Sequence, residues 1–247
     1  MQGWFKSLFK KEDVDLSPDL TTRISKLEGI IGFDIDDPSL FLKALRHRSM
    51  LSEEKYETFD SYERLEFLGD AVLDLIAAEI LFKAFPRENE GFLTKARAKL
   101  VRGKTLAHIS VVLGLEELME LGERNSGLIL SKNILADAFE SIIAAIYITM
   151  GYKEAFTFVD SVIKEHLDLN ELVNTVDNYK SVLLEYVQAR KLPMPDYRLV
   201  SESGPGHNRT FEVQVWIGEK SYGKAKGKSK KKAEQAAARL ALKEIEE

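Results

Sequence analysis

The sequence contains no cysteine and only four histidines among its 247 residues. Without cysteine there are no disulfides, no zinc sites with thiolate ligands and no iron–sulfur clusters, and a reducing cytoplasm is the compatible location. The histidines are scattered and form neither an HExxH nor an HxxxH pair: His47, His108, His166 and His207. The common histidine-based metal motifs are therefore excluded.

Long apolar runs are also missing. No run reaches the length needed to span a membrane, and the opening MQGWFKSLFKKEDVD lacks the continuous apolar core of a signal peptide. We therefore expect a cytoplasmic protein without a membrane partner. Residues 1–22 are interpreted as an N-terminal extension that is frayed or docked, with a short amphipathic turn at a surface as the alternative.

Charge is unevenly distributed along the chain, whose formal net charge is −5. Residues 178–247 hold 14 Lys and Arg against 9 Asp and Glu, a net charge of +5. Residues 1–177 hold 21 against 31, a net charge of −10. Such asymmetry predicts two domains with different partners.

The first 170 residues have the pattern of an almost purely helical domain. Apolar residues recur at three- and four-residue spacing, and the prolines (Pro18, Pro38 and Pro86) lie at plausible helix boundaries. The segment 168–177 is polar without apolar periodicity. It is interpreted as the linker between the two domains.

The pattern changes beyond the linker. The expected elements are a helix, two alternating strands, a further short strand or loop, and a last helix, at 178–191, 196–203, 209–217, 218–227 and 229–245. Phe211, Val213, Val215 and Ile217 share one face of the second strand, and Ser229 is the expected N-cap of the last helix. The predicted fold class is an all-α domain followed by a small α-β-β-β-α domain of the α+β type.

The stretch YERLEFLGDAVLD, residues 62–74, carries a line of acids. At about 100° per residue, four acids fall within a helical sector about 80° wide: Glu63, Glu66, Asp70 and Asp74. The opposite side is apolar and is expected to face the core: Leu65, Leu68, Val72, Leu75 and Ile76. Ile80 and Leu81 extend the apolar pattern. A solvated face normally mixes signs, but Arg64 is the only base between Tyr62 and Phe82. The stripe therefore lacks a positive partner nearby.

A second acidic pair lies in ILADAFESIIAAIYITM, residues 134–150, where Asp137 and Glu140 are the only charges. They face the same way on a helix that is apolar all round, which is the pattern of a buried helix. Unpaired carboxylates there are costly unless their pKa values rise, a base reaches them or a cation binds. Oxygen-only ligands suit Mg²⁺ and Mn²⁺. A divalent-metal site is the favoured interpretation, and a lysine from elsewhere in the chain is the alternative.

At these residues the chain resembles the ribonuclease III family. Four segments match its nuclease motifs in order: ALRHRS (44–49), ERLEFLGD (63–70), EGFLTKARAKLV (90–101) and LADAFESIIAAIY (135–147). The C-terminal segment resembles a double-stranded-RNA-binding domain, with GPGH and KGKSKKKAEQAAA in the expected places. The resemblance implies an endonuclease domain over 23–170, a linker over 171–177 and an RNA-binding domain over 178–247.

The resemblance also implies roles for individual residues. The family's metal-binding carboxylates fall on Glu66, Asp70, Asp137 and Glu140, and the implied catalytic acids are Asp70, Glu140, Glu63 and Glu90. The implied cofactor is Mg²⁺, with Mn²⁺ as a substitute, and no nucleotide cofactor is expected. Gly69 costs about 1 kcal/mol inside a helix, so we expect another helix to approach closely there.

Phe67 falls on the position that packs into a partner subunit in the family. It lies at the edge of the acidic stripe, where a large aromatic is not expected to face water. The resemblance therefore implies a homodimer with Phe67 in its interface.

Four positions around the acids differ from the usual family pattern. Tyr62 stands where Asn is usual, Asn133 and Ser141 replace the commoner Ser and Ala, and Ala144 replaces a frequent Gly. None of these changes removes a carboxylate, so we expect activity to be retained, with the shape of the cleft near Tyr62 altered.

The C-terminal segment carries the expected RNA contacts. Seven lysines and no acid lie between Lys220 and Lys232. A solubilising run is the ordinary interpretation of such a tract, but here the lysines open a helix whose N-terminal amides also attract phosphate. The residues expected to contact RNA are Ser181, Gln188, His207, Lys228, Lys230, Lys231 and Lys232.

These observations predict an endoribonuclease that cuts double-stranded RNA by metal-dependent hydrolysis. The resemblance implies products with 5′-phosphate, 3′-hydroxyl and short 3′ overhangs, and a role in processing ribosomal RNA precursors and other structured transcripts. Two alternatives come from other classes: a non-cleaving RNA-binding or chaperone protein on a decayed nuclease fold, and a protein-binding acidic module. The first alternative predicts lost acids, and none of the acids is lost.

Overall fold

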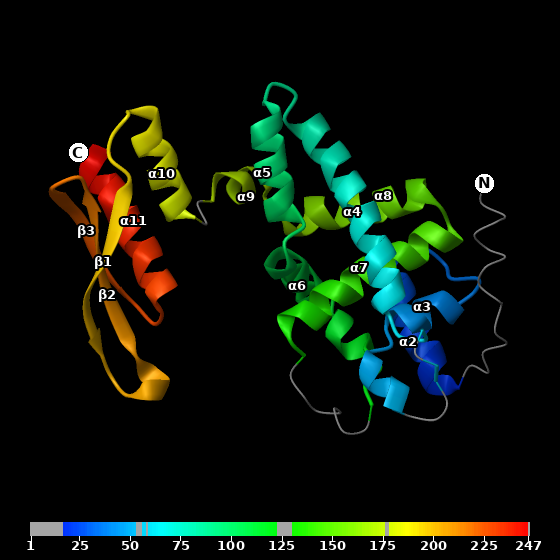
Figure 1. Ribbon diagram of the computed structural model, residues 1–247. Coiled ribbons are helices and arrows are strands. Elements are labelled where there is room, and N and C mark those ends of the chain that lie inside the picture. Colours follow the sequence, from blue (N-terminus) through cyan, green and yellow to red (C-terminus); the bar gives the residue numbers. More distant parts are fainter. Residues whose placement is uncertain (1–16, 53–55, 58, 123–129, 176–177, 247) are drawn as a thin grey trace. The chain divides into compact units, whose positions relative to one another are not determined.

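The computed structural model describes residues 17–52, 56–57, 59–122, 130–175 and 178–246. The chain divides into two compact units, Met1–Asn174 and Thr175–Glu247. The first is helical and the second contains a three-stranded sheet (Figure 1), which confirms the predicted fold class. In the described part of the chain, no helix combines the length and apolar character that a membrane crossing needs.

The first unit is built from helices joined by short turns. Its elements are α2 (Pro18–Ile31), α3 (Ser39–Ala44), η1 (Arg48–Ser52), α4 (Glu63–Ala84), α5 (Glu90–Leu100), α6 (Gly103–Val112), η2 (Leu115–Leu118), α7 (Lys132–Thr149), α8 (Tyr152–His166) and α9 (Leu169–Asn174). Proline begins α2 and caps α3, because its fixed φ suits a first helical turn. Most of the predicted N-terminal extension lies outside the described residues.

Helix α7 is the central helix of this unit. Ile142, Ile143 and Ile146 are fully buried, and α4, α6, α3 and α8 all pack on the helix. Ser131 caps its start, its hydroxyl accepting a hydrogen bond from the backbone N–H of Ile134 at 3.4 Å. The all-apolar pattern of residues 134–150 therefore marks a buried helix, as predicted.

Helix α4 packs one side on α7 and leaves the other uncovered. Leu65, Val72, Ile76 and most of the other expected core residues are buried. The prediction was wrong for Leu75, whose side chain is 55% exposed. Leu75 lies at the edge of the apolar sector, where the packed helices no longer reach it.

The segment predicted as a linker is partly helical. Helix α9 covers Leu169–Asn174, and its residues Leu172 and Val173 pack against the core of the first unit. The backbone oxygen of Val173 also accepts a hydrogen bond from Lys99. Residues 171–174 of the expected linker therefore belong to a helix that packs on the first unit.

The second unit has the predicted α-β-β-β-α order. Its elements are α10 (Tyr179–Ala189), β1 (Pro195–Ser203), η4 (Gly206–Asn208), β2 (Thr210–Ile217), β3 (Lys220–Gly227) and α11 (Lys230–Glu246). The strands form an antiparallel sheet in the order β1-β2-β3. Val213, Val215 and Ile217 are buried against the helices, as alternation predicted. The Ser229 hydroxyl accepts a hydrogen bond from the Lys232 N–H at 3.2 Å, so Ser229 is the N-cap of α11.

Candidate metal centre and nucleic-acid interface

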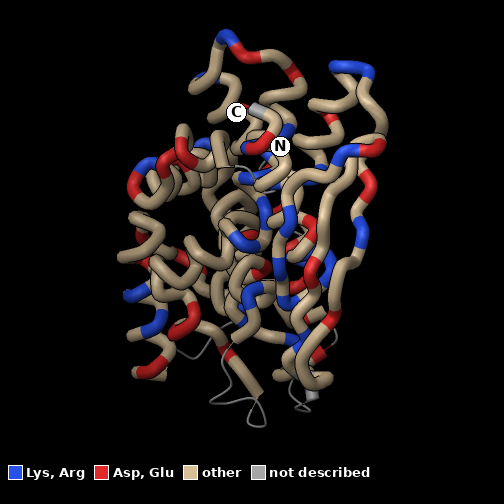
Figure 2. The backbone as a smooth tube through the Cα atoms, turned by 90° about the vertical axis from the view of Figure 1, so that its left-hand side faces the viewer, with Lys and Arg blue, Asp and Glu red and all other residues tan. Residues whose placement is uncertain are grey.

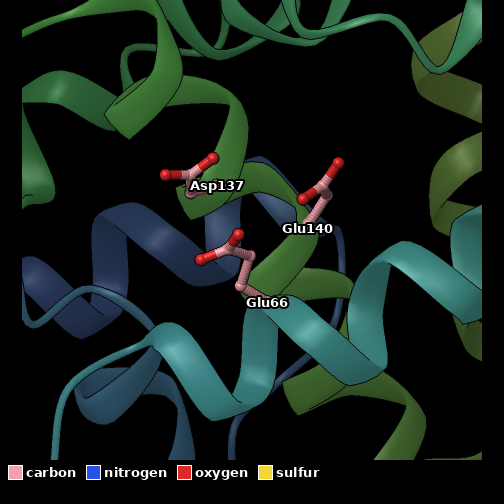
Figure 3. A group of neighbouring side chains, drawn as sticks. All are labelled: Glu66, Asp137 and Glu140. Atoms are coloured by element: carbon pink, nitrogen blue, oxygen red, sulfur yellow. The ribbon is translucent and has the colours of Figure 1, made fainter.

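Three carboxylates meet where α4 crosses α7. Glu66 comes from the first turn of α4, and Asp137 and Glu140 come from one face of α7. One oxygen from each lies within 4.8 Å of the others. Figure 3 shows the three side chains gathered beside the two helices. The i and i+3 spacing of Asp137 and Glu140 places both on the face that α4 approaches.

The environment makes these charges costly. Burial raises the pKa of Glu140 to about 8, and the neighbouring carboxylates of Asp70 and Asp137 add to the rise. Burial also raises the pKa of Glu66 and of Asp137. The raised pKa values mean that the ionised forms of these three acids are unfavourable in the metal-free protein. A cation bound among them would stabilise the ionised carboxylates.

In the described part of the chain, arginine side chains form ion pairs with acids at the two ends of the acidic stripe. Arg48 Nη1 lies 3.8 Å from Glu63 Oε1, and Arg97 Nε lies 3.8 Å from Asp74 Oδ1. Among the residues that the structure describes, no lysine or arginine forms a salt bridge with Glu66, Asp70, Asp137 or Glu140. The alternative of a lysine neutralising the central acids therefore finds no support in the described residues.

The oxygen ligands present fit a divalent cation. Carboxylates without thiol or imidazole ligands suit hard cations such as Mg²⁺ and Mn²⁺. Glu66 and Asp137 are only partly buried, so solvent can reach the cluster from their side. The ligand chemistry of the acidic cluster is therefore that of a divalent-metal site.

Asp70 and Glu63 lie beside this cluster. Asp70 is one turn after Glu66 on α4 and is exposed, and its charge raises the pKa of both Glu66 and Glu140. It is not one of the three acids whose oxygens approach within 4.8 Å. Glu63 is exposed at the start of α4 and raises the pKa of Glu66 and Asp137. Asp70 as a metal ligand and Glu63 as a catalytic acid therefore stay predictions.

Glu90 is not brought to the cluster within one chain. It is the first residue of α5, where its Oε1 accepts a hydrogen bond from the Thr94 hydroxyl at 2.9 Å. Helix α4 rises about 27 Å between Glu66 and Ala84, and α5 begins six residues after Ala84. Glu90 therefore lies toward the far end of α4 from Glu66.

Tyr62 contributes a contact that sequence reasoning missed. Its hydroxyl donates a hydrogen bond to Oδ2 of Asp137 at 3.4 Å. The departure from the family pattern at Tyr62 indicated an altered cleft. No pattern in the sequence, however, pairs Tyr62 with Asp137, which lies 75 residues later.

An exposed apolar strip runs along α4. Phe67 is 83% exposed, Leu75 55% and Phe82 71%. At spacings of eight and seven residues, these side chains lie on one flank of a single helix. Large apolar groups aligned in this way mark a surface that another protein covers.

The predicted RNA-contact residues lie around the start of α11 and along α10. Basic residues (blue) and acidic residues (red) are interspersed over much of the backbone in Figure 2. In the sequence, the run from Lys228 to Lys232 at the start of α11 contains no acid. Four lysines there are exposed: Lys228, Lys230, Lys231 and Lys232. Ser181 lies in the first turn of α10, and Gln188 is exposed near its end.

The turn between β1 and β2 is joined to this basic run. Lys228 Nζ donates a hydrogen bond to Oδ1 of Asn208 at 2.6 Å. Asn208 closes η4, which also contains His207, whose side chain is not among those described. The structure thus places the turn that carries His207, one of the expected RNA contacts, beside the lysines.

Comparisons with known proteins match both units. Residues 37–167 match a family described as ribonuclease-III-like, and residues 179–245 match the double-stranded RNA binding motif. Ribonuclease 3 of Aliarcobacter butzleri is 40% identical over 226 residues, which cover 90% of this chain and 98% of that protein. Ribonuclease 3 of Chlorobaculum tepidum is 40% identical over 238 residues, covering 95% of this chain and 86% of that protein.

A solved structure resembles the first unit. The nuclease domain of ribonuclease III from Campylobacter jejuni, reported for flexibility in a region involved in dimer formation, matches with a TM-score of 0.52 and 40% identity. The match covers 57% of this chain and 96% of that one. With a double-stranded RNA binding motif after the nuclease domain, this chain belongs to the ribonuclease III family of double-strand-specific endoribonucleases.

Proposed function

We propose that the protein hydrolyses phosphodiester bonds of double-stranded RNA with Mg²⁺ bound by Glu66, Asp70, Asp137 and Glu140. One observation carries this proposal: carboxylate oxygens from two helices converge within 4.8 Å without a basic partner among the described residues. Mn²⁺ has the same preference for oxygen ligands and is the expected substitute. The bound cation would supply an activated water and charge stabilisation at the scissile phosphate.

The chain's own residues prepare the site for this chemistry. Glu66, Asp137 and Glu140 are held by helices, so their carboxylates need little reorganisation when the substrate arrives. Glu63 lies at the rim, where its charge is partly offset by Arg48. The products expected from the family resemblance are 5′-phosphate and 3′-hydroxyl ends with short 3′ overhangs.

The second unit supplies affinity for the duplex. Lys230, Lys231 and Lys232 are exposed in the first turn of α11, where the helix N-terminus adds to their attraction for phosphate. Phosphate contacts of this kind carry no sequence information. Ser181, Gln188 and His207 are proposed to contact the minor groove, where 2′-hydroxyls distinguish RNA from DNA.

We also propose that the enzyme works as a homodimer. Phe67, Leu75 and Phe82 form an apolar strip that one chain leaves exposed, and a two-fold contact would bury it twice. In such an arrangement Glu90, remote from its own chain's cluster, could approach the cluster of the other subunit. Each cluster would then cut one strand of a duplex held in a shared valley.

The natural role that fits this activity is the processing of ribosomal RNA precursors and other structured transcripts in the cytoplasm. A non-cleaving RNA-binding protein would need the same basic residues but no converging acids. The three acids converge here, which favours the nuclease.

The direct test is cleavage of a long RNA duplex of arbitrary sequence. Purified full-length protein is incubated with end-labelled duplex RNA and Mg²⁺, with parallel reactions containing chelator, single-stranded RNA or duplex DNA. We expect short duplex products only in the Mg²⁺ reaction with duplex RNA, and end analysis should give 5′-phosphates. Duplex binding without cleavage at any Mg²⁺ or Mn²⁺ concentration would favour the non-cleaving alternative.

A further inference from the structure

Tyr62 occupies the position immediately before α4 and reaches across to α7. Its side chain is only 4% exposed, and its ring centroid lies 5.9 Å from that of His47. Packing therefore fixes the ring, while the hydroxyl lies 3.4 Å from Oδ2 of Asp137. A buried tyrosine normally has a partner for its hydroxyl, and here that partner is a carboxylate of the acidic cluster.

The backbone of Tyr62 is tied to the same two helices. Its carbonyl oxygen accepts hydrogen bonds from the N–H groups of Leu65 and Glu66, at 2.8 Å and 2.9 Å. The hydroxyl of Ser141, one turn after Asp137, lies 2.7 Å from the Asp137 carbonyl oxygen and 3.4 Å from that of Tyr62. Tyr62 thus connects the turn that carries Glu66 to the turn that carries Asp137.

The hydroxyl acts as a donor toward Asp137. An ionised carboxylate can only accept hydrogen bonds, so the Tyr62 hydroxyl, 3.4 Å from Oδ2 of Asp137, is the donor. A hydrogen bond donated to a carboxylate favours its ionised form, which is the form that binds a cation. A hydrogen bond to one carboxylate oxygen orients the group and leaves the other oxygen free for a cation.

We propose that Tyr62 is a positioning residue of the metal centre, whose hydroxyl holds the Asp137 carboxylate in the orientation that binds the divalent cation. The inference rests on the proposed metal site and adds a residue that does not touch the metal or the substrate. Removing such a partner of a ligating carboxylate typically costs 10- to 100-fold in metal affinity. Because the hydrogen bond is long, we expect the lower end of that range.

The test is Tyr62→Phe in the full-length chain, which keeps the packed ring and removes only the hydroxyl. Mn²⁺ binding without RNA is measured by electron paramagnetic resonance or calorimetry, and thermal unfolding is recorded without metal. We expect the Mn²⁺ dissociation constant to rise about tenfold. The Mg²⁺ concentration for half-maximal cleavage should rise in parallel, while the rate at saturating Mg²⁺ stays near that of the wild type.

Tyr197→Phe is the matched control. Tyr197 is in the second unit, and its buried hydroxyl has no hydrogen-bond partner among the described residues. This change should leave Mn²⁺ affinity unaltered. A purely structural role for Tyr62 would lower the unfolding temperature of Tyr62→Phe while leaving its Mn²⁺ affinity at the wild-type value, and that result would overturn the proposal.

A double-mutant cycle identifies the route of the effect. In an Asp137→Asn background, adding Tyr62→Phe should change the Mn²⁺ dissociation constant by less than about twofold, because the carboxylate that it positions is already gone. An equal loss in both backgrounds would mean that Tyr62 acts otherwise than through Asp137. A wild-type protein that binds no Mn²⁺ would instead refute the proposed metal centre itself. Unchanged Mn²⁺ affinity in Tyr62→Phe, or an equal loss in both backgrounds, would refute only the role of Tyr62.

Discussion

Gly69 of α4 lies directly against the backbone of Glu140 of α7. A Cβ atom at Gly69 would lie 1.8 Å from the carbonyl oxygen of Glu140 and 2.5 Å from its carbonyl carbon. The absence of a side chain therefore permits the crossing at which Glu66 meets Asp137 and Glu140. The close approach expected from a glycine inside this helix is confirmed.

Gly69→Ala should separate the two helices. We expect a loss of stability of about 1–3 kcal/mol from overpacking, although alanine is the better helix former, together with weaker Mn²⁺ binding. Gly29→Ala is the control, since a Cβ at Gly29 of α2 meets nothing within 4 Å, and it should stabilise by about 0.5–1 kcal/mol. Urea unfolding measures both effects, and a Gly69→Ala protein as stable as the wild type would contradict the interpretation.

Glu140→Gln should abolish most cleavage while leaving duplex binding intact. The amide keeps the shape of the side chain but removes the charge that faces Asp137 and Glu66, so cleavage should fall by orders of magnitude. Glu79→Gln makes the same change on α4 at a carboxylate that pairs with Lys83, and it should cut normally. Gel-based cleavage and filter binding are the measurements, and a Glu140→Gln enzyme with near wild-type rates would exclude Glu140 as a ligand.

Replacing Mg²⁺ by Ca²⁺ should permit RNA binding without efficient cleavage. Ca²⁺ is larger and takes more ligands in a less regular geometry than Mg²⁺. The measurement is cleavage in Ca²⁺ followed by addition of Mg²⁺ to the same complexes. Rapid cleavage in Ca²⁺ alone would show that the site does not require the smaller ion.

The stability of the metal-free protein should fall as pH rises. Burial raises the pKa of Glu140 in the folded state from 4.5 to about 8. Below the unfolded value both states are protonated, whereas between the two values only the unfolded chain releases its proton, so unfolding becomes easier with rising pH. Mg²⁺ favours the ionised carboxylate, so the rise in unfolding temperature that it causes should be larger at pH 8.5 than at pH 6. In Glu140→Gln this pH dependence should be much weaker, and an unchanged dependence would assign it to other groups.

Replacing Lys230 and Lys231 by Ala should weaken binding to all duplex sequences alike. The slope of log affinity against log salt should decrease in magnitude by about 2. Lys153 and Lys164 on α8, changed together to Ala, give the same loss of charge outside the basic run. Binding titrations at several salt concentrations test this, and loss of affinity for one sequence only would indicate base readout instead.

Phe67→Ala should weaken dimer formation. Burying one Phe contributes roughly 1.5–3 kcal/mol, and a two-fold interface would contain two copies. We expect a lower dimer affinity in sedimentation experiments and a larger loss of activity at dilute than at concentrated protein. Val112→Ala removes an apolar side chain of α6 that is 47% exposed, and it should leave assembly unchanged. A wild-type monomer that cuts both strands at full rate would refute the dimer.

Local patterns predicted much of this fold. The apolar residues on all sides of α7 identified a buried helix, and the i and i+3 spacing placed Asp137 and Glu140 on one face. Alternation in β2 identified the buried residues Val213, Val215 and Ile217. These features depend on the roughly 3.6-residue period of a helix and the two-residue period of a strand. Both periods can be read from residues that are close together in the sequence.

The same patterns failed where a distant element determines burial. Leu75 belongs to the apolar side of α4 by its angle but is exposed, because the neighbouring helices do not cover that flank. Leu172 and Val173 lie in a polar segment, yet they dock on the core as part of α9. Burial of a side chain at the edge of a pattern depends on what packs beside it.

Sequence motifs indicated which acids belong to the candidate site, but the tertiary structure decided how each is balanced. Arg48 lies near Glu63 and Arg97 near Asp74, at the two ends of the stripe. Tyr62 reaches Asp137 from 75 residues away. The sequence alone can identify the charged groups. Electrostatic energy, however, depends on distances and burial in space. The packing of α4 on α7 therefore determines which carboxylates lack a basic partner and are left for a cation to bind.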